Sequence, residues 1–252
     1  MQEGPAYQRV AEELRHGVRS GTYPPGSRLP TIAELCRTHG VSEIVIRHAV
    51  ALLRIEGMVD TRRGGGTVVR MRPPVRRRAL ERYRPETYAG ADPATSFTED
   101  HLIGWPEYRL TARYARVTAD EELAAMFAVP PGTELLRRQF LFYAREAPEQ
   151  ISVNFLPWRL VDGTPVADPS SEPWPGGTRA QLAYLGHPAT RVEESVTARM
   201  PTQAEVHQLL VAQGTPVFAI LRRMFSGEQV LEVCRHIVIP ADRVILDYRI
   251  DL

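Results

Sequence analysis

Residues 31–56 read TIAELCRTHGVSEIVIRHAVALLRIE, and their pattern indicates the fold of the first part of the chain. It predicts two helices, Thr31–His39 and Ser42–Glu56, separated by a short break at Gly40. Apolar residues in the second helix recur at i, i+3, i+4 and i+7, so one face of that helix must be buried. This buried face consists of Ile46, Ala49, Val50 and Leu53. The opposite face is expected to present Glu43, Ile44, Arg47, His48 and Arg54.

The segments on either side extend this helix pair. A first helix is expected over 5–20, and two short strands over 58–61 and 67–70 enclose the tip Arg62-Arg63-Gly64-Gly65-Gly66. Three helices followed by such a hairpin form a winged helix-turn-helix. A helix that is buried on one side and carries Arg and His on the other suits the major groove of DNA.

The formal charge is distributed unevenly along the chain. Residues 1–78 contain 14 arginines against seven acidic residues, a net +7, and the whole chain carries only +1, which leaves −6 for the remainder. The basic segment coincides with the helices and the hairpin, which indicates that this part binds a polyanion. A merely solvated charged face would not account for the coincidence.

Size and composition are those of a two-domain globular protein. The chain has 252 residues, 43% of them hydrophobic, enough for two cores. It contains no run of 18 apolar residues and no signal-peptide segment, so we expect a cytoplasmic protein. Cys36 and Cys234 are expected to be free thiols.

The organisation predicted from these patterns is a DNA-binding domain over 1–71, a linker over 72–92 and a second domain over 93–252. Pro73, Pro74 and the arginines at 76–78 favour a solvated linker, with phosphate contact as an alternative for the arginines. The second domain mixes helices and strands, with capping boxes expected at Ser96, Thr118 and Thr202. Helices are predicted over 97–103, 119–127, 179–185 and 203–211, and strands over 107–117, 134–143, 150–156, 191–199, 217–225, 230–239 and 244–250. Strands joined by short turns predict a mostly antiparallel sheet with packed helices, so the fold class is α+β.

Several short motifs carry a family resemblance. Residues 7–69 resemble the winged helix-turn-helix of GntR-type bacterial transcription regulators, through Pro25-Gly26-x-x-Leu29-Pro30, Glu34-Leu35, Gly40-Val41-Ser42, Arg47-x-Ala49 with Leu53, Glu56-Gly57 and Gly64-x-Gly66-Thr67. The remainder resembles the UTRA effector-binding domain of the HutC branch, through Thr95-Ser96-Phe97-Thr98-Glu99-Asp100, Leu156-Pro157, Ala198-Arg199-x-Pro201-Thr202, Gly214-Thr215-Pro216-Val217 and Glu232-Val233.

The resemblance implies a chorismate-lyase-like second domain and a sequence-specific regulator. It implies a homodimeric repressor on an inverted-repeat operator, released by a small-molecule effector for which an anionic group is one expectation. The dimer is also expected on physical grounds, because one head brings only about three or four side chains to base edges. The alternative is a dimeric DNA-binding repressor whose second domain is inert and binds no effector.

The candidate DNA-binding residues lie on the two helices and the hairpin. They are Arg28, Thr31, Ser42, Glu43, Ile44, Arg47, His48, Arg62, Arg63, Gly64, Gly65 and Gly66. Arg47 is expected to read a guanine or to hold a phosphate. Thr31 and Ser42 cap their helices and can also meet phosphates, whereas His48 either reaches the backbone or is simply exposed.

Two departures from the family pattern concern operator choice. The family usually has Ser-Arg-x-Thr-Val-Arg where this chain has Ser42-Glu43-Ile44-Val45-Ile46-Arg47. Glu43 can accept from a cytosine amino group, and Ile44 or Val45 can meet a thymine methyl group.

The resemblance also implies effector-binding residues, namely Ser96, Phe97, Thr98, Arg138, Ser152, Arg199 and Glu232. A helix beginning at Ser96 would offer amides and hydroxyls to an anion, although an ordinary capping box explains the same residues. Arg138 and Arg199 are expected to line the same cleft or to form structural ion pairs. Many members of this family have Glu at the position of Ser152 and Arg at the position of Phe140. The pocket is therefore expected to carry less charge, which favours a more apolar ligand.

Enzymatic motifs and metal-ligand spacings are not found in the sequence. Its histidines are scattered, and it has no Gly-x-Ser-x-Gly elbow, phosphate-binding loop or dinucleotide fingerprint. Glu193 and Glu194 are adjacent on a predicted strand and point to opposite faces, so they cannot act as a catalytic pair. We therefore expect no enzyme activity, no cofactor and no metal.

Overall fold

The computed structural model describes residues 5–62, 66–70, 74–78, 81–83, 93–212 and 214–248. The chain divides into two compact units, Met1–Pro74 (unit 1) and Val75–Leu252 (unit 2). None of the helices in the described part is long and apolar enough to cross a membrane. Cys36 and Cys234 are both free thiols.

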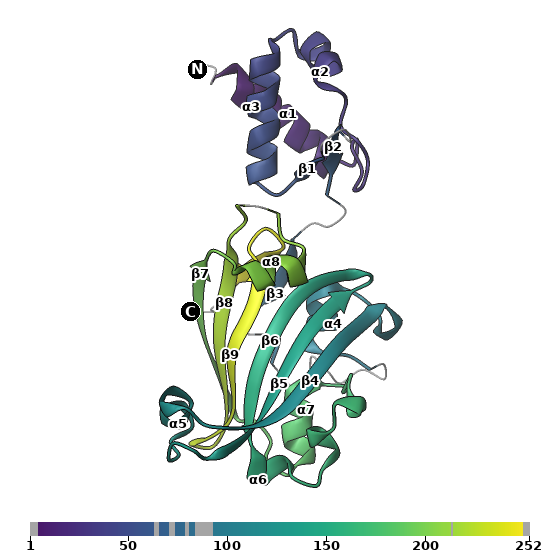
Figure 1. The fold of residues 1–252 in the computed structure, drawn as a ribbon. Coiled ribbons are helices and arrows are strands. Elements are labelled where there is room, and N and C mark those ends of the chain that lie inside the picture. The colour runs from purple at the N-terminus through teal and green to yellow at the C-terminus, as the bar shows by residue number, and fades with distance from the viewer. Residues whose placement is uncertain are drawn as a thin grey trace, which may run out of the picture. The chain divides into compact units, whose positions relative to one another are not determined.

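Unit 1 is a three-helix winged helix-turn-helix, in the order that the sequence predicts. Its elements are α1 (Ala6–Arg19), α2 (Ile32–His39), α3 (Glu43–Ile55), β1 (Val59–Arg62) and β2 (Gly66–Val69) (Figure 1). The two strands pair in antiparallel fashion. The predicted face of α3 is buried: Ile46, Ala49 and Leu53 are fully enclosed and Val50 nearly so. They pack against apolar residues of α1, including Leu14.

The turn between α2 and α3 is set by local hydrogen bonds and one glycine. Thr31 and Glu34 form the predicted capping box, with the Thr31 amide donating to the Glu34 carboxylate at 2.7 Å. Gly40 ends α2 in the left-handed conformation, φ 64°, which favours glycine. Ser42 occupies the N-cap position of α3, but its hydroxyl makes no capping hydrogen bond. The expected side-chain cap at Ser42 is therefore wrong.

Unit 2 is built on a six-stranded antiparallel sheet in the order β4-β5-β6-β9-β8-β7. Its strands are β4 (Tyr108–Thr118), β5 (Glu134–Ala144), β6 (Ala147–Pro157), β7 (Arg191–Arg199), β8 (Val217–Ser226) and β9 (Gln229–Pro240). Its helices are α4 (Ser96–His101), α5 (Glu121–Phe127), α6 (Trp158–Val161), α7 (Gly177–Tyr184) and α8 (Gln203–Leu209), with short 3-10 turns at Trp105–Glu107, Pro165–Ala167 and Pro169–Ser171. The result is the α+β arrangement that the sequence predicts.

Both faces of this sheet are covered. Leu135 packs under α5 together with Leu123, whereas its neighbour Leu136 packs with Leu182 of α7 on the other side. Successive residues of a strand point to opposite faces, so a run of buried apolar residues needs cover on both sides. The strands run side by side, with α5 near one end of the sheet (Figure 1).

One element lies inside the segment that the sequence analysis treats as a linker. Residues Val75–Arg78 form strand β3, which pairs in parallel with β10 (Val244–Asp247). Arg77 is buried, whereas Arg76 and Arg78 are exposed. The prediction of a solvated linker over 76–78 is therefore wrong. These residues belong to a strand of unit 2, and Arg77 lies in the interior of that unit.

Two caps in unit 2 differ from the prediction. The capping box of α4 joins Thr95 and Thr98 rather than Ser96 and Glu99. The cap of α5 is Asp120, which accepts from the Leu123 amide at 2.8 Å, rather than Thr118. Thr202 caps α8 with Glu205 as predicted.

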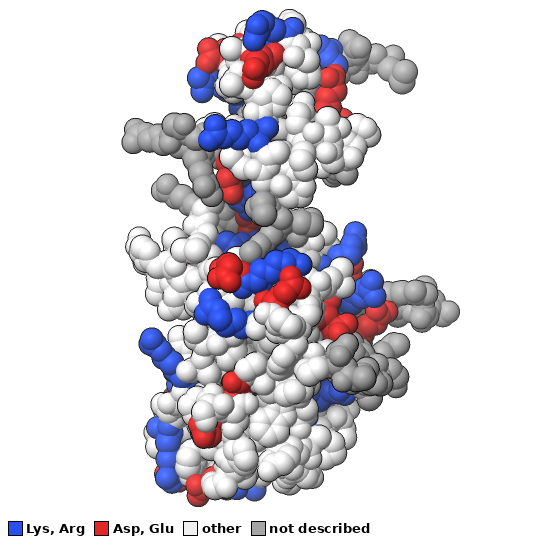
Figure 2. Space-filling view, turned by 90° about the vertical axis from the view of Figure 1, so that its right-hand side faces the viewer, with Lys and Arg blue, Asp and Glu red and all other residues white. Residues whose placement is uncertain are grey.

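The surface charges of unit 2 are mixed. Arginine and acidic side chains are interspersed over the face of unit 2 that Figure 2 presents. Exposed ion pairs also occur in unit 2, for example Arg116 with Glu134 and Arg145 with Glu107. The acidic side chains of unit 2 therefore do not form a single negative patch on the face shown in Figure 2.

Candidate functional sites

The outward face of α3 carries the side chains expected to meet DNA. Glu43, Ile44, Arg47 and His48 are all exposed, as is Ser42 just before the helix. Ile44 adds an apolar side chain to this face, with 67% of its surface accessible. The face thus combines one cation, one carboxylate and one apolar side chain.

Arg47 and Glu43 form an ion pair on this face. Arg47 donates from Nε to Oε1 of Glu43 at 3.0 Å and from Nη2 to the same oxygen at 2.5 Å, one helical turn apart. Both side chains remain more than half exposed. Such an exposed i, i+4 pair contributes only about 0.3–0.5 kcal/mol, so a DNA phosphate or base can displace the carboxylate.

The remaining predicted residues of unit 1 surround α3. The hydroxyl of Thr31 is engaged in its capping box, whereas the exposed hydroxyl of Ser42 is not used as a cap. His48 lies edge-on to the ring of Tyr7, with centroids 5.9 Å apart. Arg28 is exposed and its backbone bridges to Val68 of β2, which places it beside the hairpin.

The hairpin tip is described only at its base. Gly66 begins β2 with φ 77°, a conformation that side chains rarely adopt. Arg63, Gly64 and Gly65 lie outside the described residues, and so does the side chain of Arg62.

Unit 2 contains a pocket between the sheet and the segments that cover it. The pocket encloses about 610 Å³, counting the space at its open mouth. Aromatic and apolar side chains from β4, β5 and β9 and from α4 form much of its wall, namely Phe97, Tyr108, Leu110, Phe140, Phe142 and Ile237. The polar lining consists of Arg82, Thr95, Ser96, Gln150, Ser152, Asn154, Glu172, Thr178 and Arg222, with Trp174 and Gly177 completing it.

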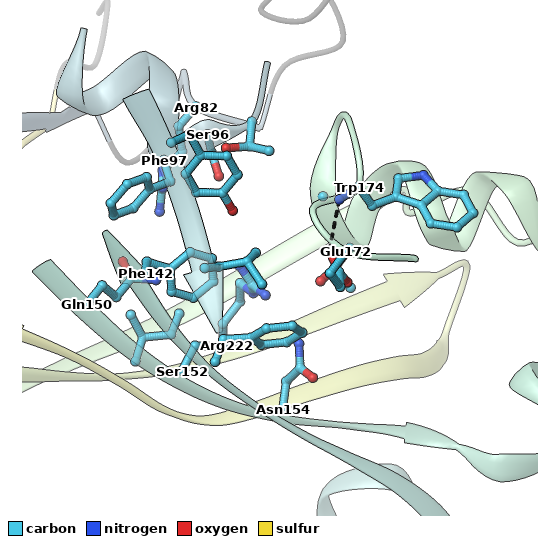
Figure 3. Close-up of a pocket in the computed structure, with 17 residues that line it drawn as sticks. Arg82, Ser96, Phe97, Phe142, Gln150, Ser152, Asn154, Glu172, Trp174 and Arg222 are labelled. Carbon is cyan, nitrogen blue, oxygen red and sulfur yellow. Dashed lines mark hydrogen bonds between the residues drawn. The ribbon is translucent and has the colours of Figure 1, made fainter. Parts of the chain in front are cut away.

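The sheet supplies one side of the pocket through strand register. Phe142 pairs with Leu110 of β4 and with Gln150 of β6, and Phe140 pairs with Ser152. Residues two apart on one strand share a face, so these side chains all point to the pocket side. Figure 3 shows Ser96 and Phe97 facing the strand residues, with Glu172 at another edge of the pocket.

Three of the seven predicted effector residues line this pocket: Ser96, Phe97 and Ser152. Thr98 is buried in the capping box of α4. Arg199 lies elsewhere, on β7, where it donates to both carboxylate oxygens of Glu205 at 2.7 Å. The expectation that Arg199 lines the cleft is wrong. Arg199 instead forms a structural ion pair with Glu205, which is the alternative given above.

Arg138 and Glu232 support the pocket from behind. Arg138 is fully buried and donates to Asn154, Gln181 and Thr178 at 2.9, 2.6 and 3.1 Å. Glu232 is also fully buried and accepts from Nε and Nη2 of Arg222 at 3.2 and 2.6 Å. Both side chains hold pocket-lining residues in place, so neither has the ligand-facing position that the sequence analysis expects.

The sequence analysis missed two arginines that line the pocket, Arg82 and Arg222. Arg82 is paired with Asp100 of α4 at 2.7 Å. Burial raises the pKa of Asp100, and the Arg82 guanidinium opposes that rise. Arg222 lies in the sequence Leu-Arg-Arg on a predicted strand, but nothing local distinguishes it from Arg223 beside it, and both are half-buried. Its role depends on Glu232, which the pairing of β8 with β9 brings beside it.

A buried polar cluster connects Arg222 to strand β3. Tyr83 donates to Oε1 of Glu194 at 2.6 Å and receives a hydrogen bond from Nη1 of Arg222 at 3.4 Å. Glu194 is paired with Arg77 of β3. Burial alone would raise the pKa of Glu194, but Arg77, Arg82, Arg222 and the Tyr83 hydroxyl hold it below the usual value.

The described residues hold no group of three or more side chains suited to bind a metal ion.

Comparisons with known proteins identify both units. Residues 6–69 match the gntR family of bacterial regulatory proteins, and residues 109–244 match the UTRA domain. The chain is 28% identical to an uncharacterised HTH-type transcriptional regulator of Streptomyces coelicolor, over 87% of this chain and 83% of the relative. It is 26% identical to the histidine utilization repressor of Klebsiella aerogenes, over 97% and 94%.

Solved structures agree with these assignments. The crystal structure of a GntR-family transcriptional regulator matches with a TM-score of 0.60 and 30% identity, over 99% of this chain and 98% of that one. PhnF of Mycobacterium smegmatis matches in fold, with a TM-score of 0.58 at 21% identity, over 96% and 99%. The chain therefore belongs to the HutC branch of the gntR family of bacterial transcriptional regulators, with a helix-turn-helix unit followed by a UTRA domain, and it is a regulator rather than an enzyme.

Proposed function

We propose that the chain is a homodimeric repressor that binds an inverted-repeat operator through unit 1 and leaves it when a small-molecule effector occupies the pocket of unit 2. The observation that carries this proposal is the buried cluster in unit 2. It links Arg222, which lines the pocket, to Arg77 of β3, and β3 is the first element after unit 1 in the chain. The repressor names of two relatives, the histidine utilization repressor and the NagR repressor of Bacillus subtilis, support the direction of regulation.

In the proposed complex α3 lies in the major groove. Arg47 exchanges Glu43 for a guanine edge or a phosphate, and exposed Ile44 meets a thymine methyl group. The free hydroxyl of Ser42 and the exposed Arg28 suit phosphate oxygens, as do Thr31 and His48 at the same surface. Arg62, Arg63 and the glycines at 64–66 belong to the proposed contact through the hairpin.

Dimerisation follows from the small reading capacity of one unit. Three or four base-contacting side chains specify too short a site, and two copies related by two-fold symmetry double it. We propose that unit 2 provides the dimer contact. Light scattering coupled to size exclusion measures this directly, and a monomer with and without operator contradicts it.

The effector acts by population shift in this proposal. A ligand changes the partners of the buried cluster when it contacts Arg82 or Arg222, or when it contacts Ser96 and shifts α4, which carries Asp100, the partner of Arg82. The position of Arg77 and β3 changes with those partners. A differential affinity of a few kcal/mol between the two states is sufficient for release.

Selection of duplexes from random DNA, followed by anisotropy titration with the recovered operator, tests the DNA-binding part. A metabolite panel is then screened by thermal shift and by operator release. A ligand that stabilises the protein by RT ln(1 + [L]/Kd) and also releases the operator is the expected result. Specific operator binding with no stabilising ligand in a broad panel favours the alternative, a repressor with an inert second domain.

A further inference from the structure

One wall of the pocket of unit 2 is aromatic, formed by Phe97, Tyr108, Phe140 and Phe142. The ring of Phe97 lies 5.4 Å from that of Phe142 and 5.5 Å from that of Tyr108, at angles of 30° and 37°. Phe140 continues the wall, 5.6 Å from Phe142. Ring faces of this kind favour a flat ligand, because stacked and edge-on aromatic contacts add to the gain from burial.

The charged side chains at the pocket are already neutralised in pairs. Arg82 is paired with Asp100, and Arg222 with Glu232. Both arginines and both carboxylates are nearly or fully buried.

Glu172 is satisfied in the same way. It accepts hydrogen bonds from the Tyr114 hydroxyl at 2.9 Å, the Gln181 amide at 2.8 Å and the Trp174 backbone at 2.9 Å, with Arg138 at 4.0 Å. The charges of the lining and of these partners sum to zero. A ligand with a net charge would find no unpaired counter-charge in this pocket, or would have to break a buried ion pair.

Two polar groups of the lining remain available. Among the described residues, the hydroxyl of Ser96 and the side-chain amide of Gln150 have no hydrogen-bond partner. In Figure 3 Ser96 lies on the α4 side of the pocket and Gln150 among the strand residues. Hydroxyl and amide groups hydrogen-bond to neutral donors and acceptors, and they add no charge.

From these observations we infer that the pocket takes an uncharged, planar ring that bears an amide or hydroxyl group. The ring lies against Phe97, Phe140 and Phe142, and its polar group bonds to Gln150 and Ser96. This inference rests on the proposed effector function of the same pocket, and it narrows the ligand to a class that excludes phosphorylated sugars and free carboxylates.

The test uses the full chain and four probes: benzamide, benzoate, benzylamine and glucose 6-phosphate. Saturation-transfer NMR and calorimetry measure binding. We expect benzamide to bind with a Kd on the order of 1 mM, as suits a single-ring ligand, and at least about tenfold more tightly than the three charged probes. Tighter binding of benzoate or glucose 6-phosphate, or no benzamide binding up to about 20 mM, overturns the inference.

Variants of Gln150 locate the binding. Gln150→Ala is expected to weaken benzamide binding about fivefold or more, and Gln150→Arg, which adds an unpaired cation, to reverse the preference towards benzoate. Gln229→Ala is the matched control, because Gln229 is an exposed strand residue outside the pocket lining. This variant should bind benzamide with unchanged affinity. Benzamide affinity that is insensitive to both Gln150 variants overturns the inference.

Operator release is measured separately, so that the two proposals fail independently. If benzamide binds as expected and operator affinity stays unchanged at saturation, the ligand class is supported and the effector function is wrong. If a charged metabolite releases the operator through this pocket, the effector function stands and the neutral ligand class is overturned.

Discussion

Arg77 of β3 and Glu194 of β7 are 117 positions apart in sequence and form an ion pair in the interior of unit 2. Arg77 donates from Nη1 to Oε2 of Glu194 at 3.2 Å and from Nη2 to Oε1, and the side chains are only 2% and 12% exposed. Tyr83 donates a further hydrogen bond to the same carboxylate. The pair therefore anchors the strand that follows unit 1 to the edge strand of the main sheet.

Breaking this pair should destabilise unit 2. Arg77→Ala leaves the Glu194 carboxylate buried without its main counter-charge, which costs about 3–5 kcal/mol of unfolding free energy. The double variant Arg77→Leu with Glu194→Leu should recover most of that loss, because both charges are then removed. Urea denaturation measures the differences. Arg76→Ala is the control, since the neighbouring pair with Asp247 is largely exposed and is expected to contribute under about 1 kcal/mol. Equal losses for Arg76→Ala and Arg77→Ala would contradict the prediction.

The same double variant separates stability from regulation. If the cluster carries the effector signal, the variant should bind operator with near-normal affinity and should no longer be released by a ligand that binds its pocket. Anisotropy titration with and without ligand measures this, and calorimetry confirms that the ligand still binds. Normal release in the folded double variant would show that the signal does not pass through Arg77.

Arg47→Ala should weaken operator binding by roughly 1–3 kcal/mol, or about 5- to 150-fold. A base contact predicts that the variant also loses discrimination at one operator position, whereas a phosphate contact predicts a uniform loss and a salt slope smaller by about one. Arg54→Ala removes the same charge near the end of α3 and should have a smaller effect. Wild-type affinity of Arg47→Ala would disprove the proposed role of this helix face.

Ile44 should read a thymine methyl group, and the contact can be tested from both sides. Replacing thymine by uracil at the contacted position removes one methyl group and should cost about 0.8 kcal/mol with the wild-type protein. With Ile44→Ala the same replacement should cost almost nothing, because the contact is already absent. Equal costs in both proteins at every thymine of the operator would rule the contact out.

The Arg199–Glu205 pair predicts a defined acid sensitivity. Hydrogen bonds from Arg199 hold the pKa of Glu205 at about 2, below its ordinary value of 4.5. Because the pKa of Glu205 is lower in the folded chain than in the unfolded chain, its ionised carboxylate stabilises the fold above about pH 4.5. This contribution is lost as the pH falls from about 4.5 through about 2. Glu205→Gln keeps the capping position but lacks the charge, so it should be less stable at neutral pH by roughly 1–2 kcal/mol after allowance for solvent screening. The difference between the two proteins should vanish once the pH is below about 2, where Glu205 is protonated in the folded and unfolded states. A difference independent of pH would contradict the assignment.

Local sequence patterns are sufficient to predict unit 1 and the outward face of α3. Helices form from contacts within a few residues, so the i, i+3, i+4, i+7 spacing of Ile46, Ala49, Val50 and Leu53 identified both the buried side and the exposed side. The strands of unit 2 were also predictable as elements, because alternation and turn residues are local signals. The caps at Thr95 and Asp120 were missed by one or two residues, since neighbouring polar residues compete for the same amides.

The pocket and the buried cluster depend on contacts between residues that are distant in sequence, so local patterns do not predict them. Arg138, Arg199 and Arg222 are all strand arginines, yet one supports the pocket, one lies in a separate ion pair and one lines the pocket. The difference arises from which carboxylate or amide the strand pairing brings opposite each of them, and that partner is distant in sequence. The linker prediction for Arg77 is wrong for the same reason: its burial depends on Glu194, a partner that the residues near Arg77 do not indicate.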